Sequence, residues 1–490
     1  MNTSGTAVPK TAPDPASPSA PITEPRRNHT VSITSEPIDF TDLDALVTTV
    51  AGPVLTPTDD GYTAELTGFN LVAIPAAQVV VGAAGAEDVA AAVRYARANG
   101  LRVGARATGH GAPIEGRGTV VVTTSRMTDI VVDPVTRTAR VGAGVRWRDL
   151  AAATAPHGLT GLVGSSSSVG VVGYHLGGGL SPLGRRFGWA ADHVRSIELV
   201  TADGIIRTVD PSAGSDLYWA ILGGRDGFGI VTAIEFELFE LPTVYGGGIF
   251  FAGSAAADVL HTWREWAPTL PEEAGTSVAI LRLPPDPNLP APLQGQLAVH
   301  VRYTHTGDPA TAAALLAPMR SAGPILLENI DVLPTAALDA VHMDPPGPMP
   351  SAERGSILHE FPASAVDALL DVAGPHVASP LAIVEVRLMG GALTQPQRVP
   401  NAVAGRHGAF NVVAIGVPAG PLGDQVGAHL AAVTRAVAPW SAGALLNFCG
   451  LDAAEREQLW TPEQRVRLET IRRRHDPTGV LRVDDPSFVG

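Results

Sequence analysis

Residues 161–188 read GLVGSSSSVGVVGYHLGGGLSPLGRRFG, and this stretch decides the fold that we expect. It combines glycines with small hydroxyl side chains. Two similar segments flank it, RATGHGAPIEG at 106–116 and LGGRDGFGIVT at 222–232. Glycine lets backbone N–H groups approach a ligand closely and form concave anion sites. The three segments together predict a cradle for a long dinucleotide with a pyrophosphate at its middle.

The two common nucleotide-binding motifs are absent from these segments. No Gly-Lys-Ser/Thr follows any of them, and none has GxGxxG spacing between the strand and helix of one βαβ unit. A phosphate-binding P-loop is therefore excluded, and a nicotinamide dinucleotide is disfavoured. Any one of these segments could be a tight turn that binds no ligand. Three such turns within about 130 residues are poorly explained in that way.

Composition and charge limit the class of protein. At 490 residues the chain is long enough for two or three domains, and its 45% hydrophobic and 17% charged residues are typical of a soluble globular protein. A formal net charge of -14 argues against a nucleic-acid partner. A small neutral, phenolic or cationic substrate is more compatible with this charge. Cys449 is the only cysteine, so no intramolecular disulfide is expected, and no metal site is predicted.

The first 35 or so residues are rich in Pro, Ser, Thr and Ala, which predicts a disordered tail. Arg26 and Arg27 form the only hint of twin-arginine export, and the polar residues after them lack the apolar region of a signal peptide. No stretch reaches the roughly 18 apolar residues that span a bilayer. We therefore expect a cytoplasmic protein without a membrane partner.

Hydrophobic periodicity divides the rest of the chain into two regions with different predicted secondary structure. From about residue 79 short strands alternate with helices, as in VVVGA followed by EDVAAAVRYARANG. From about residue 245 longer strands of alternating polarity, such as GQLAVHVRYTH and LAIVEVRLMGG, predict a mainly antiparallel sheet covered by helices. The last fifty residues return to helix.

The order RATGHG, SSVGVVGYHLGGGLSPLGRRFGWAADHV and LYWAILGGRDGFGIVT, followed by LLNFCG and RLETIRRRHDPTGVLR, resembles a known family. It is similar to the FAD-linked oxidoreductases of the p-cresol methylhydroxylase/vanillyl-alcohol oxidase superfamily, in particular the berberine bridge enzyme-like branch. The resemblance runs from about residue 75 to the C-terminus. It implies an α+β fold in which 36–243 and 441–490 form a bipartite FAD-binding domain of two α/β subdomains around a substrate-binding domain at 244–440.

The resemblance also implies how FAD is held. His110 matches the residue that bonds to the 8α-methyl carbon of the flavin, and Ser166 stands where many relatives carry a second linking cysteine. A single covalent link is therefore expected. The remaining FAD contacts implied by the match are Arg106, Ala107, Thr108, Gly109, Gly111, Gly164, Ser165, Ser168, Val169, Gly170, Gly173, Tyr174, Gly229, Ile230, Val231 and Asn447.

Several positions depart from the family pattern. Tyr174 replaces the usual His or Asn, with His175 beside it, and Gly227 replaces an asparagine. Asp484 and Asp485 stand where relatives are richer in Asn and His. These departures put individual FAD contacts in question rather than the site.

The catalytic base is the least determined part of the site. Several relatives use a tyrosine two residues before the asparagine that Asn447 matches, and Leu445 occupies that position. Strand alternation places Glu385 and Arg387 on the face opposite Val384 and Val386, where they either face the flavin or form an ion pair on a solvated face.

Two further side chains are candidates for a catalytic role. Tyr303 lies in the strand GQLAVHVRYTH and is either a phenol near the flavin or a packing residue of the sheet. His407 lies in a loop, near the place where relatives carry a histidine-arginine pair, and its role is open.

The resemblance implies an oxidoreductase that transfers a hydride from an alcohol, amine or phenolic carbon of a small molecule, such as a secondary metabolite, to flavin N5. Molecular oxygen is a candidate acceptor, and a monomer or homodimer is expected. An oligosaccharide oxidase is one alternative, against which Leu445 counts. A flavin-binding protein without redox turnover, with a binding or non-redox cyclisation role, is the alternative from another class.

Overall fold

A small mixed sheet holds the first glycine-rich segment. The computed structural model describes residues 41–72, 74–111, 118–345, 347–450, 456 and 459–481, and the predicted tail and the Asp484–Asp485 pair lie outside these ranges. In the sheet, β2 (Val79–Gly82), β4 (Thr119–Thr123) and β3 (Arg102–Arg106) run parallel, and β1 (Val54–Leu55) joins β2 antiparallel. The helices of this part are α1 (Leu43–Thr49), α2 (Tyr62–Leu66) and α3 (Ala86–Ala98).

The helix α3 connects β2 to β3, as the alternation of strand and helix predicted. Val89 and Val93 of α3 are fully buried against the sheet. The all-buried pattern of β2 fits a parallel strand with both faces covered. The strand β3 then leads directly into the segment that contains His110.

A second sheet carries the other two glycine-rich segments. Its strands are all antiparallel, in the order β5 (Ile130–Asp133), β6 (Thr138–Gly142), β10 (Ile230–Glu237), β8 (Val194–Val200) and β9 (Ile206–Val209). Beside it lie α4 (Trp147–Thr154), α5 (Val171–Leu176), α6 (Gly184–Phe187), α7 (Ser215–Gly224) and the pair β7 (Leu159–Thr160) and β11 (Phe239–Glu240).

The end of α7 shows why the third segment needs glycine. Gly223 has a φ of 108°, and a Cβ atom there would lie 2.2 Å from the backbone of Ala402 and Val403. Any larger residue would therefore clash with another segment of the chain.

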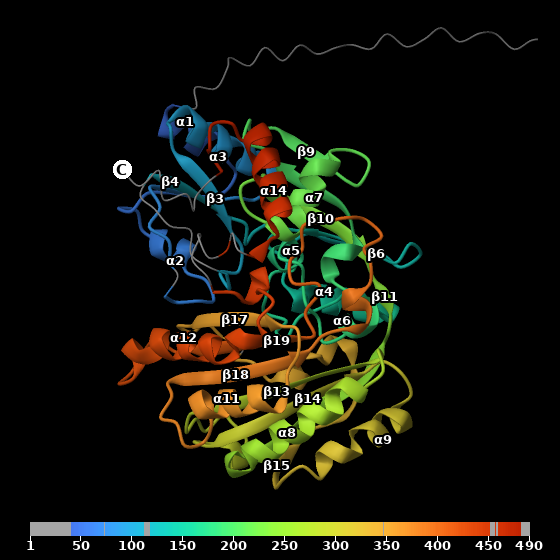
Figure 1. The fold of residues 1–490 in the computed structure, drawn as a ribbon. Coiled ribbons are helices and arrows are strands. Elements are labelled where there is room, and N and C mark those ends of the chain that lie inside the picture. Colours follow the sequence, from blue (N-terminus) through green and yellow to red (C-terminus); the bar gives the residue numbers. More distant parts are fainter. Residues whose placement is uncertain are drawn as a thin grey trace, which may run out of the picture. The chain divides into compact units, whose positions relative to one another are not determined.

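The third sheet is the largest and entirely antiparallel (Figure 1). Its order is β15 (Ile325–Glu328), β12 (Thr243–Ala252), β14 (Leu297–His305), β13 (Ala274–Arg282), β18 (Leu381–Leu388), β19 (Phe410–Gly416) and β17 (Ala352–Leu358), with β16 (Asp331–Pro334) also paired to β12. One face is covered by α8 (Ala256–Trp266), α9 (Pro309–Arg320), α11 (Ala363–Ala373) and α12 (Val426–Val437). The predicted α+β class, with an antiparallel sheet covered by helices, is confirmed.

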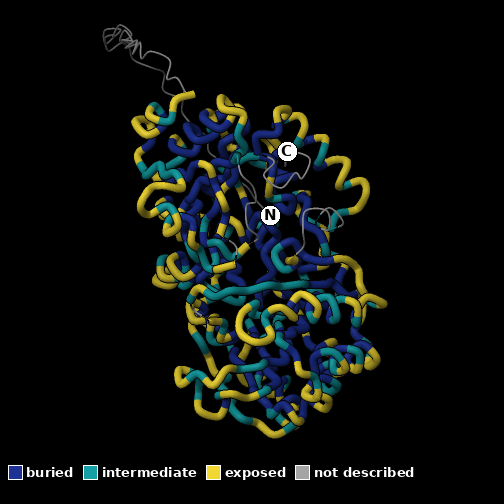
Figure 2. Tube along the Cα trace, turned by 90° about the vertical axis from the view of Figure 1, so that its left-hand side faces the viewer, coloured by how far each residue is buried: buried dark blue, intermediate teal, exposed yellow. Residues whose placement is uncertain are grey.

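The described residues form two large hydrophobic cores. One joins residues from Leu46 to Val244 with C-terminal side chains such as Leu468 and Leu481, and the other joins residues from Ile249 to Val437. Figure 2 shows buried residues through the interior of the molecule and exposed residues at the outer turns. The domain boundaries expected from the sequence stay a prediction.

The C-terminal helix α14 (Pro462–His475) packs against α7 of the second sheet. Beyond it, the buried carboxylate of Asp476 accepts hydrogen bonds from the backbone N–H groups of Val480 and Leu481, both at 2.9 Å. The N–H of Val103 in β3 donates to the Val480 carbonyl at 2.7 Å. The chain therefore returns to the first sheet at its end.

The side chains of β18 alternate as the sequence predicted. Val384 and Val386 are buried among the covering helices, whereas Glu385 lines a cavity on the other face. Arg387 shares that face with Glu385 and is also buried. Within the described part of the chain, the structure contains no helix long and apolar enough to cross a membrane.

Leu369 of α11 tests the importance of the helix layer, because its side chain is 1% exposed in the second core. Leu369→Ala is expected to lower the free energy of unfolding by about 2–5 kcal/mol, through lost apolar burial and the cavity left behind. Chemical denaturation measures this change. Asp371→Ala, an exposed position of the same helix, is the control and should shift stability by less than about 0.5 kcal/mol. Equal effects of the two substitutions would contradict the assigned helix face.

Candidate active site

A cavity of about 2290 Å³ lies between the glycine-rich segments and the uncovered face of the large sheet. One wall comes from residues 69–70, 102–111, 164–176, 225–231 and 446–450, and the other from strands β13, β14, β17, β18 and β19. Pockets for drug-sized ligands measure about 300–1,000 Å³. This cavity therefore has room for a long cofactor together with a small substrate.

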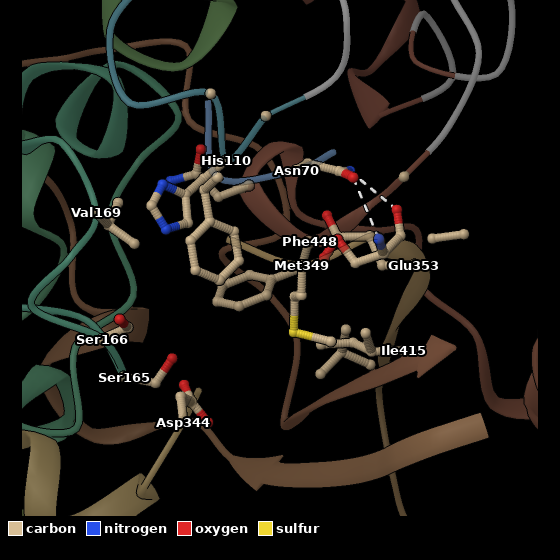
Figure 3. Close-up of a pocket in the computed structure, with 18 of the residues that line it drawn as sticks. Asn70, His110, Ser165, Ser166, Val169, Asp344, Met349, Glu353, Ile415 and Phe448 are labelled. Atoms are coloured by element: carbon tan, nitrogen blue, oxygen red, sulfur yellow. Dashed lines mark hydrogen bonds between the residues drawn. The ribbon is translucent and has the colours of Figure 1, made fainter. Parts of the chain in front are cut away.

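His110 lies on the cofactor-side wall in a fixed orientation (Figure 3). Its Nδ1 lies 2.9 Å from the Thr108 hydroxyl, its Nε2 lies 3.2 Å from the Ser168 hydroxyl, and Phe69 stacks on its ring at 4.0 Å. Burial, with a smaller effect of Arg146, lowers the pKa of His110 to about 4. The imidazole is therefore neutral at pH 7, which is the nucleophilic form.

The first glycine-rich segment is shaped around Arg106. A Cβ atom on Gly68 or Gly109 would lie 2.5 Å from the Arg106 guanidinium, and Gly109 has a φ of 70°. Backbone hydrogen bonds from Phe69 to the Thr108 carbonyl and from Asn70 to the Gly109 carbonyl hold the turn. All the described residues predicted here, Arg106, Ala107, Thr108, Gly109, His110 and Gly111, line the cavity. Residues 112–116 of this segment lie outside the described residues.

The second segment lies beside His110. Its predicted residues Gly164, Ser165, Ser166, Val169, Gly170, Gly173 and Tyr174 line the cavity. Ser168 does not line it, and instead its hydroxyl bridges His110 Nε2 and the Ser166 hydroxyl, the latter at 2.8 Å. The backbone N–H of Ser167 donates to the Asp339 carboxylate at 2.7 Å, which ties this segment to α10 (Asp339–His342) of the opposite wall.

The third segment and the C-terminal signature complete this wall. Gly229, Ile230, Val231 and Asn447 all line the cavity, and the Asn447 amide donates to the Tyr174 carbonyl at 2.9 Å. Leu445 is 2% exposed and packs in the first core against Gly405. The position that carries a tyrosine in several relatives is therefore a packing position here.

Glu385 of β18 forms a buried charged cluster with two arginines, Arg387 of the same strand and Arg302 of β14. Its Oε1 lies 3.1 Å from Arg302 Nη1 and 3.1 Å from Arg387 Nη2, and all three side chains are at most 6% exposed. Burial alone would raise the pKa of Glu385, but Arg387 and Arg302 outweigh that effect and hold the pKa well below its usual range. The solvated-face alternative is wrong, because the pair is buried and Glu385 faces the cavity.

His342 joins this cluster from α10 and lines the cavity. Its Nε2 lies 3.1 Å from Arg387 Nη2 and 3.7 Å from Glu385 Oε1, so the ring is in contact with both members of the ion pair. Burial, followed by the charge of Arg302, lowers the pKa of His342, which favours the neutral form.

The structure places two of the predicted catalytic residues away from the cavity. Tyr303 is fully buried in the second core, where its hydroxyl donates to the Ala312 carbonyl at 3.3 Å on the helix side of the sheet. His407 is exposed and does not line the cavity. Tyr303 therefore has a packing role. Because side chains alternate along β14, Arg302 points to the cavity and Tyr303 points to the opposite face.

Several cavity residues were missed by the sequence analysis. They are Phe69, Asn70, Arg225, Arg302, His342, Asp344 and Glu353. Arg302 could have been found from strand alternation, because it and His300 lie on the face of β14 opposite Val301 and Tyr303. The others lie in loops, in a short helix or at a strand end without a distinctive pattern.

The donor set and shape of this wall fit FAD. The hydroxyl of Tyr174 is buried without a hydrogen-bond partner among the described residues, and a Cβ atom on Gly173 would meet no atom within 4 Å. Arg102, Arg106 and Arg225 also line the cavity and supply the kind of positive charge that a pyrophosphate needs.

Comparison with known proteins gives the same cofactor. Residues 77–210 match the FAD binding domain family. The chain is 31% identical over 234 residues to (R)-6-hydroxynicotine oxidase of Paenarthrobacter nicotinovorans, covering 47% of this chain and 48% of that protein. It is 32% identical over 241 residues to the FAD-dependent monooxygenase prx3 of Penicillium roqueforti, covering 48% and 46%. These alignments span about half the length of the curated relatives.

Solved structures match over a longer range. The structure of 6-hydroxy-D-nicotine oxidase from Arthrobacter nicotinovorans has a TM-score of 0.76 at 26% identity and covers 89% of this chain and 98% of that chain. The berberine bridge enzyme-like protein 1 of Physcomitrella patens has a TM-score of 0.77 at 18% identity, covering 90% and 97%, which is a likeness of fold alone.

The charged cluster can be tested by removing its carboxylate. Glu385→Ala is expected to lower the free energy of unfolding by about 3–5 kcal/mol, because Arg302 and Arg387 would remain buried without a counter-charge. Denaturant titration of the purified protein measures the loss. Glu265→Ala is the control: Glu265 is 71% exposed in its pair with Arg264, and the expected change is at most about 1 kcal/mol. A loss in Glu385→Ala no larger than in this control would contradict the cluster.

Proposed function

We propose that this chain, whose residues 77–210 belong to the FAD binding domain family and whose fold is that of the FAD-linked oxidoreductases, is an FAD-dependent oxidoreductase acting on a small organic substrate. This match to the FAD binding domain family agrees with the family resemblance of the glycine-rich segments. The observation that carries the proposal is the shared cavity, in which a cofactor-binding wall faces a sheet bearing the ionised Glu385.

When bound, FAD supplies the hydride acceptor at flavin N5, and the protein supplies orientation and control of the proton. The glycines of the three segments would let backbone N–H groups approach the cofactor, and the arginines that line the cavity would balance its phosphate charge. Asn447, tied to the Tyr174 carbonyl, holds the C-terminal signature against the second segment.

We further propose a single covalent attachment of FAD through His110. Three features support it: the ring is neutral at pH 7, hydroxyls contact both of its nitrogens, and Phe69 fixes its plane. A neutral imidazole is a competent nucleophile once the flavin 8α position is electrophilic. Ser166 lines the cavity where relatives carry the second linking cysteine, and its hydroxyl cannot form a thioether.

Glu385 is proposed to orient the substrate rather than to take its proton. A carboxylate held far below its usual pKa is a poor general base at neutral pH, but it accepts hydrogen bonds strongly. An uncharged O–H or N–H of the substrate that donates to Glu385 would be positioned beside the cofactor wall. Arg302, Arg387 and His342 act as positioning residues for that carboxylate.

The floor of the cavity argues for an apolar substrate body. The cavity-facing positions of neighbouring strands, Ile415, Ile383 and Leu281, form a continuous row across β19, β18 and β13. An oligosaccharide carries several hydroxyl groups on each ring, and those directed at these side chains would have no hydrogen-bond partner. The oligosaccharide alternative is therefore weaker than a small aromatic or aliphatic molecule.

The covalent link predicts where the flavin colour goes on acid precipitation. In the wild-type protein the yellow colour should stay in the pellet, and in His110→Ala it should move to the supernatant, because only non-covalent contacts remain. His407→Ala, a histidine outside the cavity, is the control and should behave as the wild type does. Free flavin in the wild-type supernatant would refute the covalent attachment.

The redox function predicts bleaching of the flavin on anaerobic mixing with substrate. We expect one or more alcohols, amines or phenols of a small-molecule panel to reduce it, and Glu385→Gln to slow reduction about 100-fold through loss of substrate orientation. Stopped-flow absorbance measures the rate, Glu265→Gln is the control, and oxygen uptake tests the acceptor. Bleaching by dithionite but by no panel compound would favour a binding role without redox turnover.

A further inference from the structure

Glu353 stands alone at the edge of the cavity floor. It lies on β17 opposite Ile415 of β19, so it extends the row formed by Ile415, Ile383 and Leu281 toward the cofactor wall. Figure 3 shows it near Asn70, Met349 and Phe448, and all of these residues line the cavity.

Within the described ranges, no cationic side chain is paired with the carboxylate of Glu353. Among the described residues no side chain forms a hydrogen bond or an ion pair with it, in contrast to Glu385 with its two arginines. Burial raises the pKa of Glu353 to about 7, and no neighbouring charge opposes that effect. Because Glu353 is only partly buried, a ligand in the cavity can reach its carboxylate, and a positive charge on that ligand would stabilise the ionised form.

Of the two described glutamates that line the cavity, Glu353 suits a cation better than Glu385, which lies in the charged cluster. There, two guanidinium groups face one carboxylate, so the Arg302–Glu385–Arg387 cluster carries one net positive charge and repels an ammonium group. The row runs from Leu281 through Ile383 and Ile415 to Glu353, and Glu353 is its only charged member, whereas Glu385 lies beside its middle, two residues from Ile383 on β18. A molecule with an apolar body and a cationic end therefore fits the floor in one direction.

We propose that Glu353 is the specificity-determining residue of the cavity and binds the ammonium group of a small amine, whose apolar body lies on Ile415 and Ile383. This inference rests on the proposed function and specifies its substrate class. A neutral hydroxyl would also donate to Glu353, but a charge-assisted hydrogen bond is about twice as strong as a neutral one.

Matched probes test the proposal by binding alone. The oxidised FAD-loaded protein is titrated with 2-phenylethylamine and, separately, with 2-phenylethanol, and the change in the flavin absorbance spectrum gives each dissociation constant. The wild type should bind the amine about tenfold or more tightly than the alcohol. Glu353→Gln should weaken amine binding about 10- to 100-fold and leave alcohol binding within about threefold.

Two further variants complete the experiment. Glu353→Asp keeps the charge and should recover part of the amine affinity, and Glu360→Gln, at an exposed glutamate just beyond β17, should match the wild type. Unchanged flavin content and melting temperature show that each variant is folded and loaded.

The outcomes separate this inference from the proposed function. Equal amine affinity in the wild type and Glu353→Gln, equal losses for both probes, or a wild-type spectrum that the amine leaves unchanged would each overturn the role of Glu353. Binding that depends on Glu353, without any reduction of the flavin by amines, would leave the recognition intact and remove the redox role instead.

Discussion

The ion pairs of Glu385 with Arg302 and Arg387 are the interaction on which the arrangement of the cavity depends. Three charges are held out of water on one face of a sheet whose opposite face is apolar and covered by helices. Removing Glu385 would leave two buried guanidinium groups without a counter-charge, so the pairing of β14, β13 and β18 must keep Arg302 and Arg387 beside it. Because that pairing also aligns Leu281, Ile383 and Ile415, the charged cluster and the apolar floor are two consequences of one alignment.

The cofactor wall could be predicted from the sequence because its information is local. Glycines at Gly109 and Gly223 are required by backbone conformation or by close approach of other segments, and such requirements leave a readable pattern in a single chain. The position of His110 followed from the segment around it, and the structure places it on the cavity wall. The faces of β18 followed from alternation, which needs no knowledge of distant partners.

The substrate wall could be predicted only in part, because its members meet through long-range pairing. Glu353 and Ile415 become neighbours only when β17 pairs with β19 at the sheet edge, and β17 precedes β18 and β19 in the chain. His342 reaches the cluster from a helix of four residues that no periodicity marks. Tyr303 was proposed as a residue near the flavin, but it lies on the opposite face of β14, where it packs under the covering helices.

The two walls of the cavity come largely from different stretches of chain, and most of the floor strands pack in the second core, although Ile357 of β17 belongs to the first. Substitutions on the floor strands can therefore alter which molecule is accepted while the cofactor site keeps its shape, so evolution can diversify substrates on a constant redox centre. The contact between Ser167 and Asp339 is a restraint on that freedom, because it fastens the loop beside His110 to the helix that carries His342. Chemical diversification of this scaffold should then be easiest on β19 and more constrained around α10 and at the start of β17, where Ser351 is hydrogen-bonded to the Asn70 side chain.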